Sequence, residues 1–378
     1  MSEATPGRSP REAREKFVVV DADTHIDETE ATWSYVEPHE KEMAPLAGAP
    51  RQIDPSRPAT RYWVVDGRRH LRFIRDDART GTTVETRELL DVTARLRAMD
   101  QMGVDVHVIY PTLFLMAITD NPAADRAARR SYNRWLAGRC ERSNGRLRWI
   151  IMPPLMDMKE TIEELRFGKA HGACGVLKKG DREAGAWVDD EYFFPLYEEA
   201  QRLNLPICFH TGSGTLDSTP AKNFTSSRLF RIGMPPQHAF HSLVFHNVPQ
   251  RFPSLRWGFI EAGASWVPAV LYNLARTMKK RYHLGNGPFN FGQYSVAGNV
   301  LKNNNLYVSC MVDEDLPYLL KSMGEENILV GSDYSHGDAA IELDFQAELQ
   351  GRADRGEISP GLVRRIISDN PRRFYGLE

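Results

Sequence analysis

The sequence has few cysteines, and no two of them lie close together. Among 378 residues only four are cysteines, namely Cys140, Cys174, Cys208 and Cys310, and no C-x-x-C pair occurs. This spacing excludes a paired-cysteine zinc motif and a small disulfide scaffold. The last three cysteines fall in apolar, strand-like segments, where a free cysteine is commonly a small buried hydrophobic residue. We therefore expect reduced thiols and a cytoplasmic protein.

Long hydrophobic runs and an excess of charge are also missing. No apolar run is long enough to span a bilayer, and residues 1–16 are polar and charged, unlike the apolar core of a signal peptide. The formal net charge is −2 and the basic residues are scattered, which gives no electrostatic case for binding nucleic acid or an anionic membrane. We expect a disordered lead-in over residues 1–16, one domain over residues 17–378 and a small-molecule substrate.

Eight strand-like apolar segments, each followed by at least one helical pattern, are spread along the chain. They lie near residues 18–20, 104–110, 147–155, 174–177, 206–209, 255–260, 306–311 and 327–330. Such alternation favours a parallel sheet, and eight units favour a single (β/α)8 TIM barrel. A doubly wound open sheet is the alternative. That fold normally places a glycine-rich phosphate loop after its first strand, where this chain has Asp21-Ala-Asp-Thr-His25.

An irregular segment over about residues 28–85 separates the first strand from the regular pattern. Within it, Tyr62–Val65 and Leu71–Ile74 flank Asp66-Gly67, which is a typical β-hairpin turn. We expect this insertion to fold over the mouth of the barrel as a lid or a dimer contact. A surface decoration fits the pattern equally well.

Polar residues follow several of the predicted strands at the point where each strand ends. Asp23 and His25 end the first, His210 the fifth, Glu261 the sixth and Asp333 the eighth. Chemistry in a (β/α)8 barrel is carried by this rim, and barrel closure places the eighth strand beside the first. Imidazole and carboxylate together suit zinc, manganese or iron, so the rim predicts a divalent metal site. Each residue taken alone is also a common turn residue.

These segments resemble the amidohydrolase superfamily, in the branch of aminocarboxymuconate-semialdehyde decarboxylase and the resorcylate decarboxylases. The similar segments are Asp23-Thr-His25, Arg95–Asp105, His210, Arg251–Trp257, Glu261–Pro268, Gly331–Tyr334 and Asp369–Leu377. The resemblance implies a metal-dependent TIM-barrel enzyme that hydrolyses or decarboxylates a small carboxylated or aromatic substrate. It implies that Asp23, His25, His210 and Asp333 bind the metal, and a homodimer or higher oligomer is the default expectation.

The sequence departs from those decarboxylases at two positions. Its first pair is Asp-x-His rather than His-x-His or Glu-x-His, which keeps an oxygen donor. Glu261 stands where the decarboxylases carry a histidine. We expect Glu261 to act as a proton carrier or as a ligand to a second metal ion.

Further histidines leave a second function open. With Glu261, His336 fits the pattern of dinuclear iron or iron–manganese oxygenases that are similar to this branch, although a loop histidine fits as well. His241 is a weaker catalytic candidate, and His246 weaker still, because both fall in a predicted helix. Lys178 and Lys179 suggest a carboxylated lysine or a substrate contact, but solvent exposure is the favoured interpretation. A non-catalytic subunit of this fold is the third, least favoured alternative.

Overall fold

Eight parallel strands form the central sheet of the molecule. The computed structural model describes residues 17–51, 60–72, 75–215, 229–279, 300–337 and 340–377. The strands, in their order around the sheet, are β1 (Val20–His25), β5 (Val106–Tyr110), β6 (Leu147–Ile151), β7 (Ala173–Lys179), β8 (Ile207–His210), β9 (Trp257–Ile260), β10 (Leu306–Ser309) and β11 (Ile328–Leu329). All seven neighbouring pairs are parallel, as a run of β–α units requires. The predicted (β/α)8 barrel is confirmed.

The barrel closes at a seam between β11 and β1. Here the amide of Asp333 donates to the carbonyl of Asp23 at 3.0 Å, and the amide of His25 donates to the carbonyl of Tyr334 at 2.9 Å. The segment just after β11 thus completes the ladder beside β1. The seam therefore joins the first and last strands of the barrel at their carboxyl ends.

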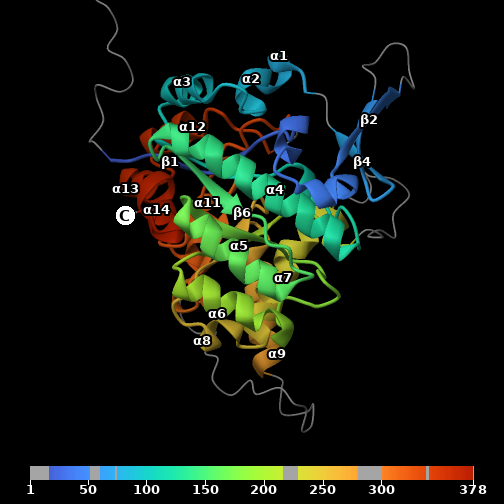
Figure 1. Ribbon diagram of the computed structural model, residues 1–378. Coiled ribbons are helices and arrows are strands. Elements are labelled where there is room, and N and C mark those ends of the chain that lie inside the picture. The colour runs from blue at the N-terminus through green and yellow to red at the C-terminus, as the bar shows by residue number, and fades with distance from the viewer. Residues whose placement is uncertain are drawn as a thin grey trace, which may run out of the picture.

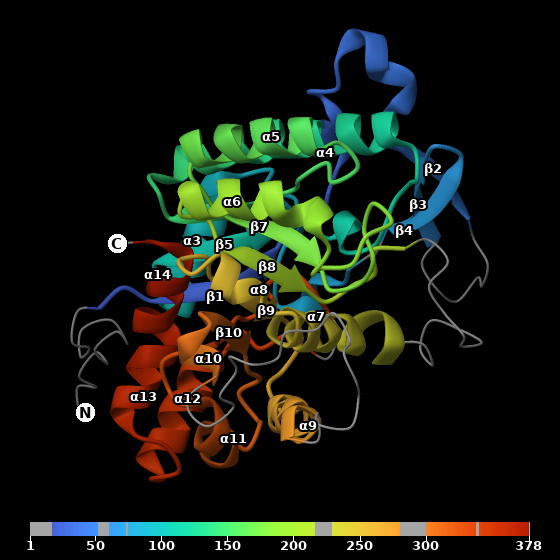
Figure 2. The same ribbon diagram turned by 90° about the horizontal axis from the view of Figure 1, so that it is seen from below.

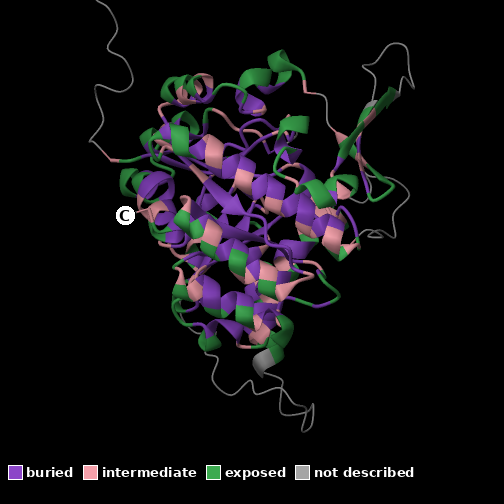
Figure 3. Ribbon diagram, viewed as in Figure 1, coloured by how far each residue is buried: buried purple, intermediate pink, exposed green. Residues whose placement is uncertain are grey.

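Helices surround the strands on all sides (Figures 1 and 2). The main ones are α3 (Val92–Met102), α4 (Pro122–Cys140), α5 (Met158–Ala170), α6 (Phe194–Arg202), α7 (Met234–Phe245), α8 (Val248–Arg251), α9 (Val267–Lys279), α10 (Val300–Asn303), α11 (Leu316–Met323), α12 (Phe345–Asp354), α13 (Pro360–Arg364) and α14 (Asn370–Tyr375). Buried residues are concentrated on the strands and the inner helix faces, and exposed ones lie outside (Figure 3). All six residues of β1 are buried, as expected for a strand covered on both faces.

Local sequence determines where two of the helices begin. α3 begins at Val92, because Asp91 caps it by accepting from the amide of Thr93 at 2.8 Å. α7 begins at Met234, since two prolines are tolerated in its first turn. It is separated from α8 at Asn247, whose φ is 58°.

A small antiparallel sheet precedes α3. It consists of β2 (Leu46–Arg51), β3 (Thr60–Val65) and β4 (Arg68–Arg72). The β3–β4 hairpin confirms the turn predicted at Asp66-Gly67, where both residues have positive φ. In Figure 2 this sheet lies beyond the ends toward which β7 and β8 point, which is the side that carries the rim residues. β2 was not predicted, and residues 52–59 and 73–74 of the insertion lie outside the described residues.

Two expectations drawn from the composition can be compared directly with the structure. All four cysteines are free and buried. No helix within the described ranges is both long and apolar enough to cross a membrane. The predicted lead-in over residues 1–16 lies outside the described residues.

Candidate active site

The carboxyl ends of β1, β8, β9 and β11 bring the predicted rim residues together. Asp23, His25, His210 and Glu261 each offer one ligand atom, and these atoms lie within 4.8 Å of one another. Asp23 Oδ1 is 3.3 Å from His25 Nε2 and 3.4 Å from His210 Nε2. Glu261 Oε2 is 3.3 Å from His210 Nε2. We call this group the first cluster.

Three residues at the carboxyl ends of the strands have an unusual backbone conformation or unusually close packing. Glu261 directly follows β9 and Asp333 lies four residues beyond the end of β11, with φ values of 54° and 52°, in the left-handed region that residues other than glycine seldom adopt. Such strain persists only where surrounding structure enforces it, and it is commonly found at functional sites. Gly331 lets the end of β11 approach β1, because a β-carbon there would collide with the β-carbon of Asp23. These conformations turn both carboxylates toward the histidines.

The orientation of the two histidines is fixed by backbone carbonyls. His25 Nδ1 lies 2.8 Å from the carbonyl of Pro111, and His210 Nδ1 lies 3.1 Å from the carbonyl of Thr211. A carbonyl only accepts, so each Nδ1 carries the proton. The lone pairs on both Nε2 atoms are then directed into the first cluster, which is the usual arrangement of metal-binding histidines.

The first cluster fits a divalent cation. Asp23 Oδ1, His25 Nε2 and His210 Nε2 are buried, and none of them has a hydrogen-bond partner among the described residues. Three buried lone pairs that face one another are costly unless a positive charge lies between them. Burial opposes a proton on His210, but Asp23 and Glu261 outweigh this effect and raise its pKa. The cluster therefore favours positive charge at its centre and can hold a metal ion.

A second group of possible ligands shares His25 and Glu261 with the first. It adds Asp333 and His336, again with ligand atoms within 4.8 Å of one another. His336 Nδ1 is 2.7 Å from Asp333 Oδ1, and its ring stacks on His25 with centroids 3.7 Å apart. We call this group the second cluster.

The hydrogen bonds of His336 bear on what lies in the second cluster. The single hydroxyl proton of Thr112 is directed at the carbonyl of Ile26 at 2.7 Å, so the hydroxyl accepts from His336 Nε2 at 3.1 Å. Burial, with a contribution from His25, lowers the pKa of His336 well below its ordinary value, which leaves Nδ1 unprotonated. A lone pair then faces a carboxylate oxygen of Asp333, an arrangement that a cation between them would relieve.

A buried polar network supports the rim from beneath and was not predicted. Arg95, which lies in α3, donates through Nη1 to the carbonyl of His25 at 3.2 Å and through Nε to His107 at 3.1 Å. Its guanidinium also lies 3.9 Å from the ring centroid of Tyr334, the residue after Asp333. Both β1 and the segment after β11 thus rest on one buried cation.

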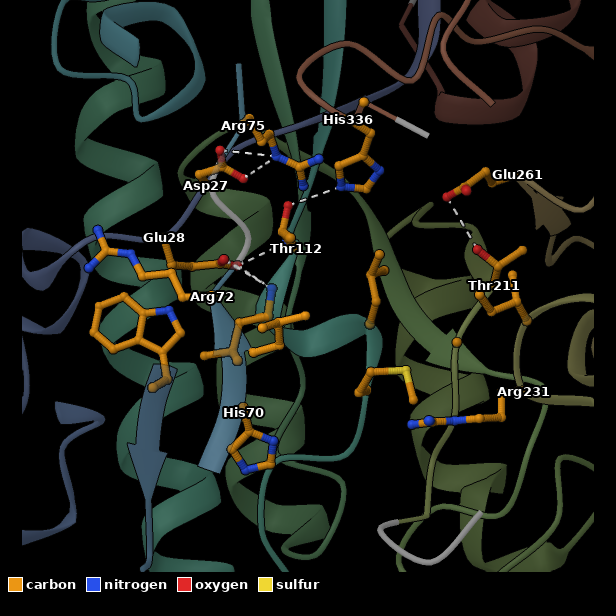
Figure 4. Close-up of a pocket in the computed structure, with 18 of the residues that line it drawn as sticks. Asp27, Glu28, His70, Arg72, Arg75, Thr112, Thr211, Arg231, Glu261 and His336 are labelled. Carbon is orange, nitrogen blue, oxygen red and sulfur yellow. Dashed lines mark hydrogen bonds and ion pairs between the residues drawn. The ribbon is translucent and has the colours of Figure 1, made fainter. Parts of the chain in front are cut away.

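A cavity of about 1070 Å³ opens onto the two clusters (Figure 4). Glu261 and His336 lie at one end of the view and His70 and Arg231 at the other. The cationic lining residues are Arg68, Arg69, Arg72, Arg75, Arg79 and Arg231. Several of them come from β4 and the following turn, so the insertion forms a wall of the cavity. Four acidic residues, Asp27, Glu28, Asp76 and Glu261, also line the cavity, so it is the wall formed by the arginines that favours an anionic group.

Glu28 also lines this cavity and was missed in the sequence. Its carboxylate accepts from the amides of Thr112 and Leu113 at 2.9 to 3.0 Å. Burial raises its pKa to about 7, even though these hydrogen bonds favour the charged form. Nothing in the sequence around Glu28 indicates this role, because both donors lie more than 80 residues away in the chain.

Four candidates are not part of either cluster. The ring of His241 stacks on Phe245 of the same helix, and His241 does not line the cavity. His246 lies 3.5 Å from Asp189. The expectation that Lys178 and Lys179 are solvent-exposed is wrong. Both are buried, and Glu183 folds back to bind them at 3.1 and 3.3 Å.

Comparison with known proteins places this chain in a family. The chain is 24% identical over 258 residues to 2-amino-3-carboxymuconate-6-semialdehyde decarboxylase of Dictyostelium discoideum. The matched region covers 65% of this chain and 66% of that relative, which is slightly under two thirds of the relative's length. An amidohydrolase from Mycobacterium avium subsp. paratuberculosis shares the fold, with a TM-score of 0.75 and 20% identity over 97% of this chain and 99% of that one.

A decarboxylase structure shares the fold as well. The 5-carboxyvanillate decarboxylase of Novosphingobium aromaticivorans, solved with manganese and 3-methoxy-4-hydroxy-5-nitrobenzoic acid, has a TM-score of 0.68 and 16% identity over 95% of this chain and 97% of that one. The amidohydrolase family model matches residues 20–377, which is nearly the whole chain. The chain therefore belongs to the amidohydrolase family, a family of enzymes.

Proposed function

We propose that this chain is a metal-dependent enzyme that removes a carboxyl group, without oxidation, from a small aromatic or enol carboxylate. The observation that carries the proposal is an arginine-lined cavity that ends on the first cluster. A bound carboxylate would meet cations along the wall and donor atoms at the floor. The decarboxylases among the relatives support this reaction over hydrolysis.

Asp23, His25, His210 and Asp333 are the proposed ligands. When bound, a divalent ion such as manganese or zinc would polarise substrate oxygens. Arg231 and the arginines of β4 would orient the anionic substrate from the far wall. Bidentate pairing between guanidinium and carboxylate fixes both position and angle, which is what a selective pocket needs.

Glu261 is the proposed proton carrier. Its Oε2 accepts from the hydroxyl of Thr211 at 3.2 Å, and its side chain lines the cavity. When the carbon–carbon bond to the leaving carboxylate breaks, the electron pair remains on the substrate carbon. A proton delivered from Glu261 then forms the new carbon–hydrogen bond, and carbon dioxide leaves.

The test uses Glu261→Gln, with Glu198→Gln on the exposed side of α6 as the matched control. Carbon dioxide release is measured from small aromatic and enol carboxylates, and metal content is measured by elemental analysis without chelator. Glu261→Gln should keep one ion per chain and lose about 100-fold or more in rate, as expected for removal of a general acid. Loss of the ion from Glu261→Gln would contradict its assignment as proton carrier. Full metal content in Asp333→Ala would contradict the assignment of Asp333 as a ligand.

A dinuclear iron or iron–manganese oxygenase is the second candidate, favoured by the second cluster. A second ion would be held by Glu261, Asp333 and His336. His336→Ala separates the two proposals. Loss of one of two ions, with oxygen consumption in the parent protein, supports the dinuclear site. Retention of a single manganese or zinc ion supports the decarboxylase.

A further inference from the structure

A second cavity of about 460 Å³ adjoins the first but is built differently. Ala117 and Thr215 line both cavities. The second lies against Lys179, at the end of β7, and Arg129, in the middle of α4. None of the residues proposed as metal ligands lines it.

The buried cations beside this cavity use only part of their hydrogen-bond donors on their carboxylate partners. Arg129 Nε pairs with Asp125 at 2.7 Å, which neutralises both groups. Glu183 is shared between Lys178 at 3.1 Å and Lys179 at 3.3 Å. Two buried ammonium groups therefore share one hydrogen-bonded carboxylate, and Asp181 adds a further attraction to Lys178.

Of the two buried lysines, Lys179 faces the cavity. Lys178 Nζ lies 3.8 Å from the ring centroid of Phe193 and does not line the cavity, whereas Lys179 does. Lys179 is 1% exposed, and within the described chain its ammonium makes one hydrogen bond, to Glu183. An ammonium carries three donors, so two are directed elsewhere. Buried charge with unused donors beside a hollow is a site for an ion of opposite sign.

Arg129 adds a planar donor to the same wall. Its Nε binds Asp125 and its Nη1 binds the carbonyl of Pro153 at 3.2 Å, and no partner for Nη2 occurs among the described residues. The other acid at the mouth, Asp120, is exposed and lies 3.7 Å from Arg68. The donors available are thus an ammonium and one guanidinium edge.

We propose that this second cavity binds a small oxyanion, of carboxylate or sulfate type, through Lys179 and Arg129. The volume exceeds that of a single halide, and the mixed ammonium and guanidinium donors suit oxygen acceptors. The site is separate from the metal clusters, so it does not depend on the proposed reaction. Its position beside the larger cavity would place a bound anion next to Thr215 and Ala117.

Lys179→Met and Lys178→Met form a matched pair that tests the proposal. Both remove one ammonium and leave Glu183 with one lysine, so both keep the buried pair intact. Any effect of net charge alone appears in both variants, and only their difference reports a direct bond in the cavity. Circular dichroism and melting confirm that each variant is folded.

Binding of acetate and of sulfate to the metal-loaded protein is measured by calorimetry in low-chloride buffer. Lys179→Met should bind about 10-fold or more weakly than Lys178→Met, the loss expected for one charge-assisted hydrogen bond. The two anions distinguish a planar carboxylate site from a tetrahedral one. Equal binding by both variants, or no binding by the parent, would overturn the proposal.

A crystallographic measurement keeps the test valid if Lys179→Met does not fold. Bromide soaked into crystals of the parent protein should give an anomalous peak within hydrogen-bond reach of Lys179 Nζ. A peak only at the arginines of the larger cavity would refute the site.

Discussion

Replacing Glu183 with glutamine should destabilise the protein strongly, because Glu183 is the one carboxylate shared by Lys178 and Lys179. Burial alone would raise the pKa of Glu183, but Lys179 and Lys178 outweigh it and lower the pKa from 4.5 to about 2. Each pH unit between these values is worth about 1.4 kcal/mol, so the charged form contributes about 3 kcal/mol. Loss of one partner of a buried ion pair costs about 3–5 kcal/mol, which agrees.

The expected change in melting temperature follows from chain length. Unfolding entropy of about 2.1 cal/mol/K per residue gives about 0.8 kcal/mol/K for 378 residues. A loss of about 3–5 kcal/mol then lowers the melting temperature by about 4–6 °C. Lys179→Met, which leaves Glu183 paired with Lys178, should lower it by much less.

The pH dependence of the free energy of unfolding tests whether Glu183 is charged in the folded protein. A carboxyl group with a lowered pKa stabilises the folded state above its unfolded pKa, and that stabilisation is lost as the pH falls from 4.5 toward 2. Glu183→Gln should therefore flatten this part of the stability curve, as measured by chemical denaturation at several pH values. Melting within about 1 °C of the parent would show that the lysines are uncharged and would refute the reasoning.

Three further substitutions test the rim and its support. The pKa of Glu28 is raised to about 7, so the folded state holds a proton that the unfolded state loses near pH 4.5. The free energy of unfolding should therefore fall by about 3 kcal/mol as the pH rises between these two values. Glu28→Gln should abolish that fall, as measured by chemical denaturation at pH 5 and pH 8. Gly331→Ala should cost about 1–3 kcal/mol and reduce metal content, because the new methyl group collides with Asp23. Arg95→Met should lower metal affinity, since the carbonyl of His25 loses its buried donor, while Arg95→Lys should restore part of it; unchanged metal titration in Arg95→Met would contradict this role.

Local sequence patterns were sufficient to predict the barrel and most of the residues at the carboxyl ends of its strands. Alternation along an extended strand places Asp23 and His25 on one side, and the common rim of parallel strands brings His210 and Glu261 to them. Both inferences need only the period of a strand and the closure of a sheet. The residues that fill the cluster were therefore predictable, whereas their roles as ligands remain predictions.

Long-range contacts account for what the sequence did not reveal. Arg95 reaches the carbonyl of a residue 70 positions away, and Glu28 accepts from amides 84 and 85 positions away. No spacing rule encodes such pairs. Lys178 and Lys179 were expected in solvent because lysine is seldom buried. Their burial depends on Glu183, whose position is set by the turn after β7.

The seam between β11 and β1 has a consequence for how the enzyme matures. Asp23 and His25 leave the ribosome about 310 residues before Asp333 and His336. Domains are synthesised from the N-terminus at about 5–20 residues per second, so the early half of the cluster waits many seconds for the late half. A chain that is interrupted before β11 lacks both the seam and the proposed ligand Asp333. Capture of metal would then mark a chain whose barrel has been synthesised as far as its eighth strand.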